Sequence, residues 1–228
     1  MIVIHNKNLR TTMKYLIPFV LIPVLVAISS LVFAGQRYII ISLGIAVLAI
    51  LLFMTGFERK NIGSRRMVIT AIMTALAVFG RFIPLFKPIT AICVMTAVYL
   101  GAEAGFLCGS LSVLISNIYF GQGPWTPFQM LGFGLIGLFA GYLSKVLLRS
   151  RWLMILYGVI AGVAYSFIMD VWTVLWYAGG FDLKLYTAAI VSAIPFTLLY
   201  AVSNVIFLLI LQKPVGNKLN RIKIKYGV

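Results

Sequence analysis

The chain has 228 residues, of which 62% are apolar and only 10% charged, and its mean hydropathy is +1.08. A soluble domain carries about 25% charged residues, so this composition excludes a soluble fold. The net charge of +15 does not indicate nucleic-acid binding, because the cations lie between apolar blocks and in the C-terminal tail, and no nucleic-acid-binding module is recognisable.

Apolar blocks of about 18 to 25 residues recur along the chain, the length that a helix needs to cross a hydrocarbon core about 30 Å thick. The sequence therefore predicts an all-α, polytopic membrane bundle of about eight transmembrane helices. The predicted spans are residues 15–34, 38–57, 67–84, 88–102, 104–120, 127–148, 152–178 and 186–211. They divide the chain into an N-terminal basic segment with a two-helix extension (1–62), a six-helix core (63–213) and a basic tail (214–228).

The first span follows three cations, as the apolar run of a signal peptide does. It is too long for a signal peptide and a second span follows almost at once, so we expect a retained helix. Further along, only Gly101, Glu103 and Gly105 separate the fourth span from the fifth, and these residues predict a tight turn.

The distribution of cations predicts the orientation of the bundle. An even number of spans places both termini on one side, and 15 of the 19 Lys and Arg residues fall in the segments on that side. The positive-inside rule therefore places both termini in the cytoplasm of a multi-pass cell-membrane protein. The opposite, outer side holds the remaining four cations, which are Arg37, Arg81, Lys87 and Lys184.

The sequence lacks the motifs of ATP hydrolysis and of zinc binding. There is no G-x-x-x-x-G-K-[ST] phosphate loop, and His5, Cys93 and Cys108 do not have the spacing of a zinc site. Both cysteines lie in apolar sequence, which favours two small buried side chains, although a disulfide between them stays open. We expect no catalytic residue, no bound metal and no cofactor.

The third span carries small residues one helical turn apart. Ala71 and Ala75 have the small-xxx-small spacing that lets another helix approach closely. The same spacing also serves packing within a chain, so the pattern alone leaves both roles open.

Residues 117–129 form the least lipid-compatible irregular stretch of the chain. Glycines and prolines break the helix there, and backbone groups released at membrane depth must be buried in protein or line a cavity. We expect the segment to offer ligand-binding groups on the outer side, which are Asn117, Gln122, Trp125 and Gln129. An interfacial aromatic belt is the alternative for Trp125.

Two further regions hold candidate binding residues. Asp170 lies within the seventh span, where a carboxylate is costly unless it is paired, protonated or exposed to a polar cavity. Trp172 and Trp176 share one face of that helix and suit either ligand contact or an aromatic belt. Arg81 and Lys87, in a short outer loop, either cap a ligand or reach lipid headgroups.

From residue 67 to residue 213 the chain resembles the substrate-binding S components of energy-coupling factor (ECF) vitamin transporters. The resemblance rests on the six-span block, on Ala71-x-x-x-Ala75, and on G-Q-G-P-W-T-P-F-Q-M-L-G-F-G-L-I-G from Gly121 to Gly137. It implies that the alanine-bearing helix docks on a membrane coupling subunit that carries two ATPase subunits. It also implies that outer loops around Lys87, Gln122 and Trp125 contact a vitamin. The usual S component has six spans, so the two extra N-terminal spans depart from the family pattern.

The resemblance predicts the vitamin-capture subunit of an ECF-type importer, which agrees with the missing phosphate loop. The Gly121 to Gly137 stretch is similar to S components assigned to cobalamin or other corrinoids, whereas an aromatic, amide-rich pocket also suits flavin, thiamin-like and queuosine-like ligands. Two alternatives are a self-sufficient secondary transporter, for which a single intramembrane carboxylate is a poor relay, and a structural membrane protein without a ligand.

Overall fold

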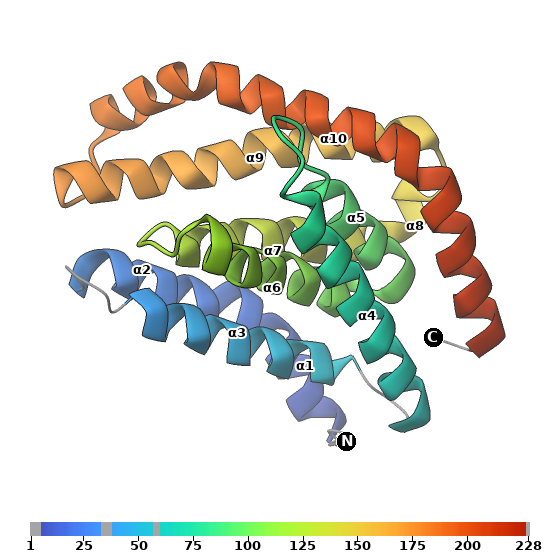
Figure 1. The fold of residues 1–228 in the computed structure, drawn as a ribbon. Coiled ribbons are helices and arrows are strands. Elements are labelled where there is room, and N and C mark those ends of the chain that lie inside the picture. Colours follow the sequence, from blue (N-terminus) through green and yellow to red (C-terminus); the bar gives the residue numbers. More distant parts are fainter. Residues whose placement is uncertain (1–5, 33–37, 57–59, 227–228) are drawn as a thin grey trace.

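The structure, a computed structural model, describes residues 6–32, 38–56 and 60–226, and every regular element in these ranges is a helix (Figure 1). The N-terminal extension consists of α1 (Lys7–Leu16), a π-helical turn η1 (Ile17–Leu21), α2 (Ile22–Val32) and α3 (Tyr38–Thr55). The remainder consists of α4 (Lys60–Gly80), α5 (Ile89–Leu100), α6 (Ala102–Phe120), α7 (Thr126–Tyr142), α8 (Ser144–Leu147), α9 (Arg151–Ala178) and α10 (Leu183–Tyr226).

All eight predicted spans correspond to helical segments, which confirms the all-α membrane bundle. In the described ranges, five segments are long and apolar enough to cross a membrane by themselves: α1 to α2, α3, α6, α9 and α10. By contrast, α5 has only 12 residues, and all of them except Tyr99 are buried. Its surroundings are protein rather than lipid, so it does not need to match the thickness of the bilayer.

The turn between α5 and α6 forms at the glycine where the sequence predicts it. Gly101 has φ of 101°, a left-handed conformation that only glycine adopts at little cost, and it ends α5 directly before α6 begins. Cys93 and Cys108 meet across these two helices as free, fully buried thiols whose Sγ atoms lie 3.9 Å apart.

Helices α6 and α7 are in direct backbone contact. A Cβ added at Gly109 or Gly137 would overlap the backbone of Phe133 or Gly105 on the other helix. This contact explains the glycine repeat in the α7 sequence, because any larger side chain would force the two helices apart. The pair forms the centre of the bundle, with α3, α4, α5 and α9 packed around it (Figure 1).

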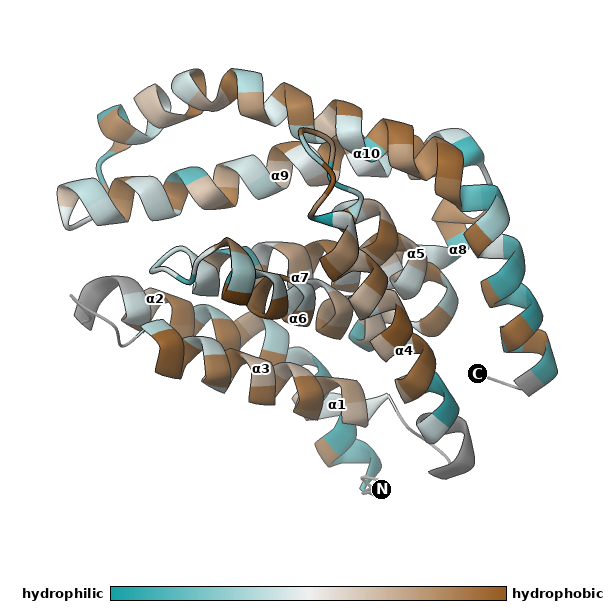
Figure 2. Ribbon diagram, viewed as in Figure 1, coloured by the Kyte–Doolittle hydropathy of each residue, from teal (hydrophilic) through white to brown (hydrophobic). Residues whose placement is uncertain are grey.

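The start of α1 and the end of α10 lie at the same end of the bundle, as an even number of spans requires (Figure 1). The other end of the bundle, which we call the distal end, holds the connections 81–88, 121–125 and 179–182. Residues 214–226 of the predicted basic tail are helical and continuous with the last span. Helix α10 continues through Pro214 to Tyr226, and Figure 2 shows that its last turns are largely hydrophilic.

Candidate functional site

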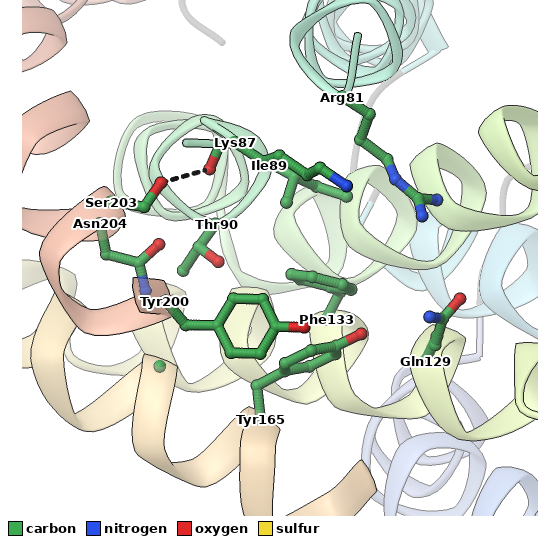
Figure 3. A pocket seen from close by; sticks show the side chains of 11 residues that line it. Arg81, Lys87, Ile89, Thr90, Gln129, Phe133, Tyr165, Tyr200, Ser203 and Asn204 are labelled. Carbon is green, nitrogen blue, oxygen red and sulfur yellow. Dashed lines mark hydrogen bonds between the residues drawn. The ribbon is translucent and has the colours of Figure 1, made fainter. Parts of the chain in front are cut away.

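A cavity of about 170 Å³ lies among the distal halves of four helices and the loop that precedes α5 (Figure 3). Its polar lining comes from the loop (Arg81, Lys87), from α5 (Thr90), from α7 (Gln129) and from α9 and α10 (Tyr165, Tyr200, Ser203, Asn204). Ile89, Phe133 and Gly162 complete the wall. The lining thus combines aromatic rings, amides, hydroxyls and two cations, a set that suits a ring-shaped ligand with several hydrogen-bonding edges.

Arg81 is held in the cavity wall by hydrogen bonds to neutral side chains, which are in turn bonded to one another. Its Nη1 donates to the Ser116 hydroxyl and, over 2.7 Å, to Asn117 Oδ1. The amide nitrogen of Asn117 then donates to Gln129 Oε1 (2.9 Å) and to the Thr126 hydroxyl (3.1 Å). Asn117 is itself only 1% exposed, so it acts behind the cavity, where it orients both Arg81 and Gln129.

The two cations of the cavity have no carboxylate partner among the described residues. Both lie near the ring of Phe120, with Arg81 Cζ 5.2 Å and Lys87 Nζ 5.6 Å from its centroid. Burial lowers the pKa of the Lys87 ammonium from its ordinary value, and the charge of Arg81 lowers it further. The cavity therefore carries uncompensated positive charge, which favours a ligand edge rich in hydrogen-bond acceptors or negative charge.

Three aromatic side chains form the apolar part of the wall. The rings of Phe133 and Tyr165 have centroids 4.3 Å apart, and Tyr165 meets Tyr200 edge to face at 5.3 Å. In Figure 3 both tyrosine rings border the space between Asn204 and Gln129. Sequence reasoning missed all three residues, together with Thr90 and Ser203. Tyrosines in the middle of an apolar span were the available signal, because a buried hydroxyl requires a polar neighbour.

Helix α10 is joined to its neighbours by side chains of the cavity wall. Asn204 donates to the Gly158 carbonyl on α9 over 2.9 Å, and the Ser203 hydroxyl donates to the Lys87 carbonyl over 3.0 Å. Asn204 thus joins α10 to α9 through a side-chain hydrogen bond. Its position in the cavity wall is an additional finding.

Asp170 lies two turns along α9 from Gly162, toward the distal end. Its side chain is buried, with 6% exposed, and the Oδ2 atom has no hydrogen-bond partner. A buried carboxylate oxygen without a donor is costly, which marks the position as more than packing. The structure brings Asp170 close to the cavity without placing it in the wall.

The three predicted tryptophans form a cluster of their own at the distal end. Trp125 meets Trp172 edge to face, with centroids 5.9 Å apart, and Trp172 and Trp176 lie 6.3 Å apart. None of them is among the residues that line the cavity. Trp176 is 51% exposed, which suits the alternative of an aromatic belt. Gln122 is also engaged elsewhere, because its amide donates to the Leu114 carbonyl over 2.8 Å.

Ala71 and Ala75 are exposed on one side of α4. They line an apolar groove of about 500 Å³, whose walls are α3 on one side and α6 on the other. Among the described residues, no other helix covers these two alanines.

A family model described as "ECF-type riboflavin transporter, S component" matches residues 61–219, which is more than half of the chain. The chain belongs to this family. No curated protein and no solved structure matches it.

An ECF S component is a multi-pass membrane protein that captures a vitamin for an ECF module, whose other parts are a transmembrane subunit and ATPases. The matched range begins at the start of α4, so α1 to α3 precede it, as the two extra spans do in the sequence prediction. The cobalamin-type subset is not confirmed, because the family description names riboflavin.

Proposed function

We propose that the chain captures riboflavin, or a closely related flavin, in the cavity at the distal end. The observation that carries this proposal is the uncompensated charge of Arg81 in a wall that also holds Tyr165, Tyr200 and Gln129. An isoalloxazine ring offers flat apolar faces for the aromatic side chains and carbonyl and ring-nitrogen acceptors for the cation and the amide. The family description supports the same ligand.

The rest of the wall suits the remainder of such a ligand. Thr90, Ser203 and Asn204 bring hydroxyl and amide groups to one side of the cavity, where they would meet the hydroxyls of a ribityl chain. A pocket for a drug-sized molecule has about 300 to 1,000 Å³, so a cavity of about 170 Å³ must widen when a flavin binds. A corrinoid would demand much more space, so the size of the cavity favours a flavin over cobalamin.

We assign the distal end to the outer face of the cell membrane, with both termini in the cytoplasm. The asymmetry of 15 cations against four supports this orientation. The ligand would then enter from outside, past the tryptophans Trp125 and Trp172. We assign to this pair the closing of the cavity in the bound state, and to Asp170 a hydrogen bond from a donor group of the ligand.

The capture proposal is tested by titrating detergent-purified protein with riboflavin, thiamin and cobalamin while protein and flavin fluorescence are recorded. Riboflavin should bind, and Arg81→Gln should weaken that binding by roughly tenfold to a hundredfold, because a hydrogen bond to a charged group contributes about 1.5–3 kcal/mol. Lys184→Gln is the matched control, since it removes an exposed cation of the same end. Absence of riboflavin binding would refute the proposal, and cobalamin binding in its place would restore the corrinoid prediction.

We further propose that the exposed face of α4 around Ala71 and Ala75 docks on the transmembrane subunit of the ECF module. The open apolar groove beside these alanines supports this role, because small side chains let a partner helix approach the backbone. Ala71→Trp or Ala75→Trp should abolish ATP-driven uptake and co-purification with the module while riboflavin affinity stays unchanged. Uptake by the isolated chain in proteoliposomes would instead indicate a secondary transporter.

A further inference from the structure

Helix α10 is much longer than a membrane span requires. Its 44 residues correspond to about 66 Å of helix, whereas the hydrocarbon core is about 30 Å thick. The excess lies in its last part, residues 213–226, which we call the tail helix. Pro214 lacks a backbone donor at its start, and α10 bends in its last third in Figure 1. The tail helix therefore leaves the direction of the span near the membrane surface.

One face of the tail helix is fixed to the bundle. Gly216 is buried, and a Cβ at this position would lie 2.6 Å from the hydroxyl of Tyr99 at the end of α5. Leu219 is 3% exposed and Ile222 is partly buried, so positions 216, 219 and 222 form a stripe at helical spacing. This packing determines which residues of the tail helix face away from the protein.

Lys218 and Arg221 lie on the opposite face, whereas Lys223 is an exposed residue that continues the line of Gly216 and Leu219 toward the end of the helix. The tail helix contains no acidic residue and five cations, which are Lys213, Lys218, Arg221, Lys223 and Lys225. All five are exposed. Lys218 and Arg221 stand three residues apart on one side, and beside them Ile224 is 76% exposed. Exposed apolar and cationic side chains on one surface are the pattern of a helix that lies on a lipid headgroup layer.

Lys213, Lys218, Arg221 and Lys223 have no carboxylate partner among the described residues. Glu103 is engaged by Lys14 and Arg66, and Asp170 and Asp182 lie in the distal part of the bundle. The connection around α8, at the same end as the tail helix, adds Lys145 and Arg149 (Figure 1). An anionic partner from outside the chain can therefore bind these four cations.

We propose that the tail helix binds the headgroups of anionic phospholipids in the leaflet that faces both chain termini. A cluster of cations directly after a transmembrane helix is the arrangement that recognises such headgroups, and its attraction decays within a Debye length of about 8 Å at physiological salt. The packing of Gly216 against Tyr99 holds the cations at a fixed position, and the exposed Ile224 reaches into the acyl boundary.

The test uses the full chain in nanodiscs of phosphatidylcholine that contain a small fraction of spin-labelled phosphatidylglycerol. The chain should bind phosphatidylglycerol in preference to labelled phosphatidylcholine, and 0.5 M NaCl should reduce this preference. Lys218→Gln/Arg221→Gln/Lys223→Gln should lower it by roughly fivefold or more, because each surface cation contributes about a factor of five. Lys218→Arg/Lys223→Arg should retain it.

Asn217→Gln/Asn220→Gln is the matched control, since it changes two exposed residues of the same helix without changing its charge. Thermal unfolding of each variant shows whether the bundle remains folded. Equal binding of the two lipids by the natural chain, or an unchanged preference in the triple Gln variant, would overturn the proposal. If a triple Gln variant retains the lipid preference but no longer co-purifies with the ATPase subunits, the partner of these cations is an acidic protein surface and the proposal is wrong. None of these measurements involves the vitamin, so the result is independent of the capture proposal.

Discussion

Two arginines near the ends of α4 show how differently one residue type is used in this chain. Arg66 is 8% exposed and donates to Glu103 Oε2 (3.1 Å) and to the Gly56 carbonyl (3.0 Å). Lys14 reaches the other oxygen of the same carboxylate over 2.7 Å. Within the described part of the chain, Arg81 donates to the neutral side chains of Ser116 and Asn117. The charge of Arg66 is thus balanced within the chain, whereas that of Arg81 remains available to a ligand.

The comparison separates an ionic contact that builds the fold from one that serves binding. Glu103 connects α1 of the N-terminal extension with α4 and α6 of the core, so the extension is fastened at the end that carries the termini. Buried ion pairs contribute little net stability when complete, but removal of one partner leaves the other charge buried and uncompensated. The two arginines should therefore respond to substitution in opposite ways.

The largest effect is expected from Glu103→Gln, which leaves two cations without their carboxylate. Loss of one partner of a buried pair typically costs about 3–5 kcal/mol, so the melting temperature in detergent should fall steeply while riboflavin affinity of the folded fraction stays unchanged. Arg66→Met added to Glu103→Gln should recover part of the stability, because it removes one of the unpaired charges. A Glu103→Gln protein as stable as the natural chain would show that the ion pairs of Glu103 do not stabilise the packing of the extension on the core.

A smaller effect on stability and a clear effect on binding are expected from Asn117→Leu. This change removes the acceptor of Arg81 and the donor of Gln129, so it should cost about 1–3 kcal/mol of stability and weaken riboflavin binding at least several-fold. Gln122→Ala is the comparison, because that amide bonds the Leu114 carbonyl and does not touch Arg81. Equal losses of affinity in calorimetric titrations of the two variants would contradict an orienting role for Asn117.

The smallest effect concerns pH. Because the pKa of Lys87 is lowered, its ammonium loses its proton at a less alkaline pH than an ordinary lysine, and the positive charge of the cavity falls with it. Riboflavin affinity should therefore decline with rising pH more in the natural chain than in Lys87→Arg, whose guanidinium keeps its proton. The ratio of the two affinities across the pH range cancels the titration of the ligand, and a constant ratio would exclude Lys87 from the site.

The sequence predicted the fold better than it predicted the cavity, and individual residues show why. Hydropathy identifies spans without knowledge of their partners, so all eight helical segments and the turn at Gly101 were predictable. Arg81, Lys87 and Gln129 were recognised because polar groups near irregular backbone stand out. Tyr165, Tyr200 and Phe133 were not, because an aromatic residue in an apolar span looks the same whether it faces lipid or a cavity. Only the packing of α9 and α10 against α7 distinguishes the two positions.

The helical end of α10 was not predicted, for a related reason. Hydropathy marks where a helix leaves the apolar phase and does not mark where it stops being helical, so the predicted span ended at residue 211. Pro214 lies inside α10 three residues beyond that boundary, because a proline can bend a helix without ending it. The contact of Gly216 with Tyr99, which holds the continuation in place, joins residues more than a hundred positions apart and is invisible to local patterns.

The backbone contact between α6 and α7 also decides how the protein accommodates molecules of different size. Because glycines bring the backbones of α6 and α7 into contact, the two helices cannot move closer together. Gln129 and Phe133 on α7 therefore keep their positions in the cavity wall. The facing residues Tyr165 and Tyr200 belong to the long, lipid-exposed pair α9 and α10. The cavity can therefore widen by movement of α9 and α10, whereas its α7 wall stays fixed. Changes of ligand preference should accordingly arise from substitutions in α9 and α10.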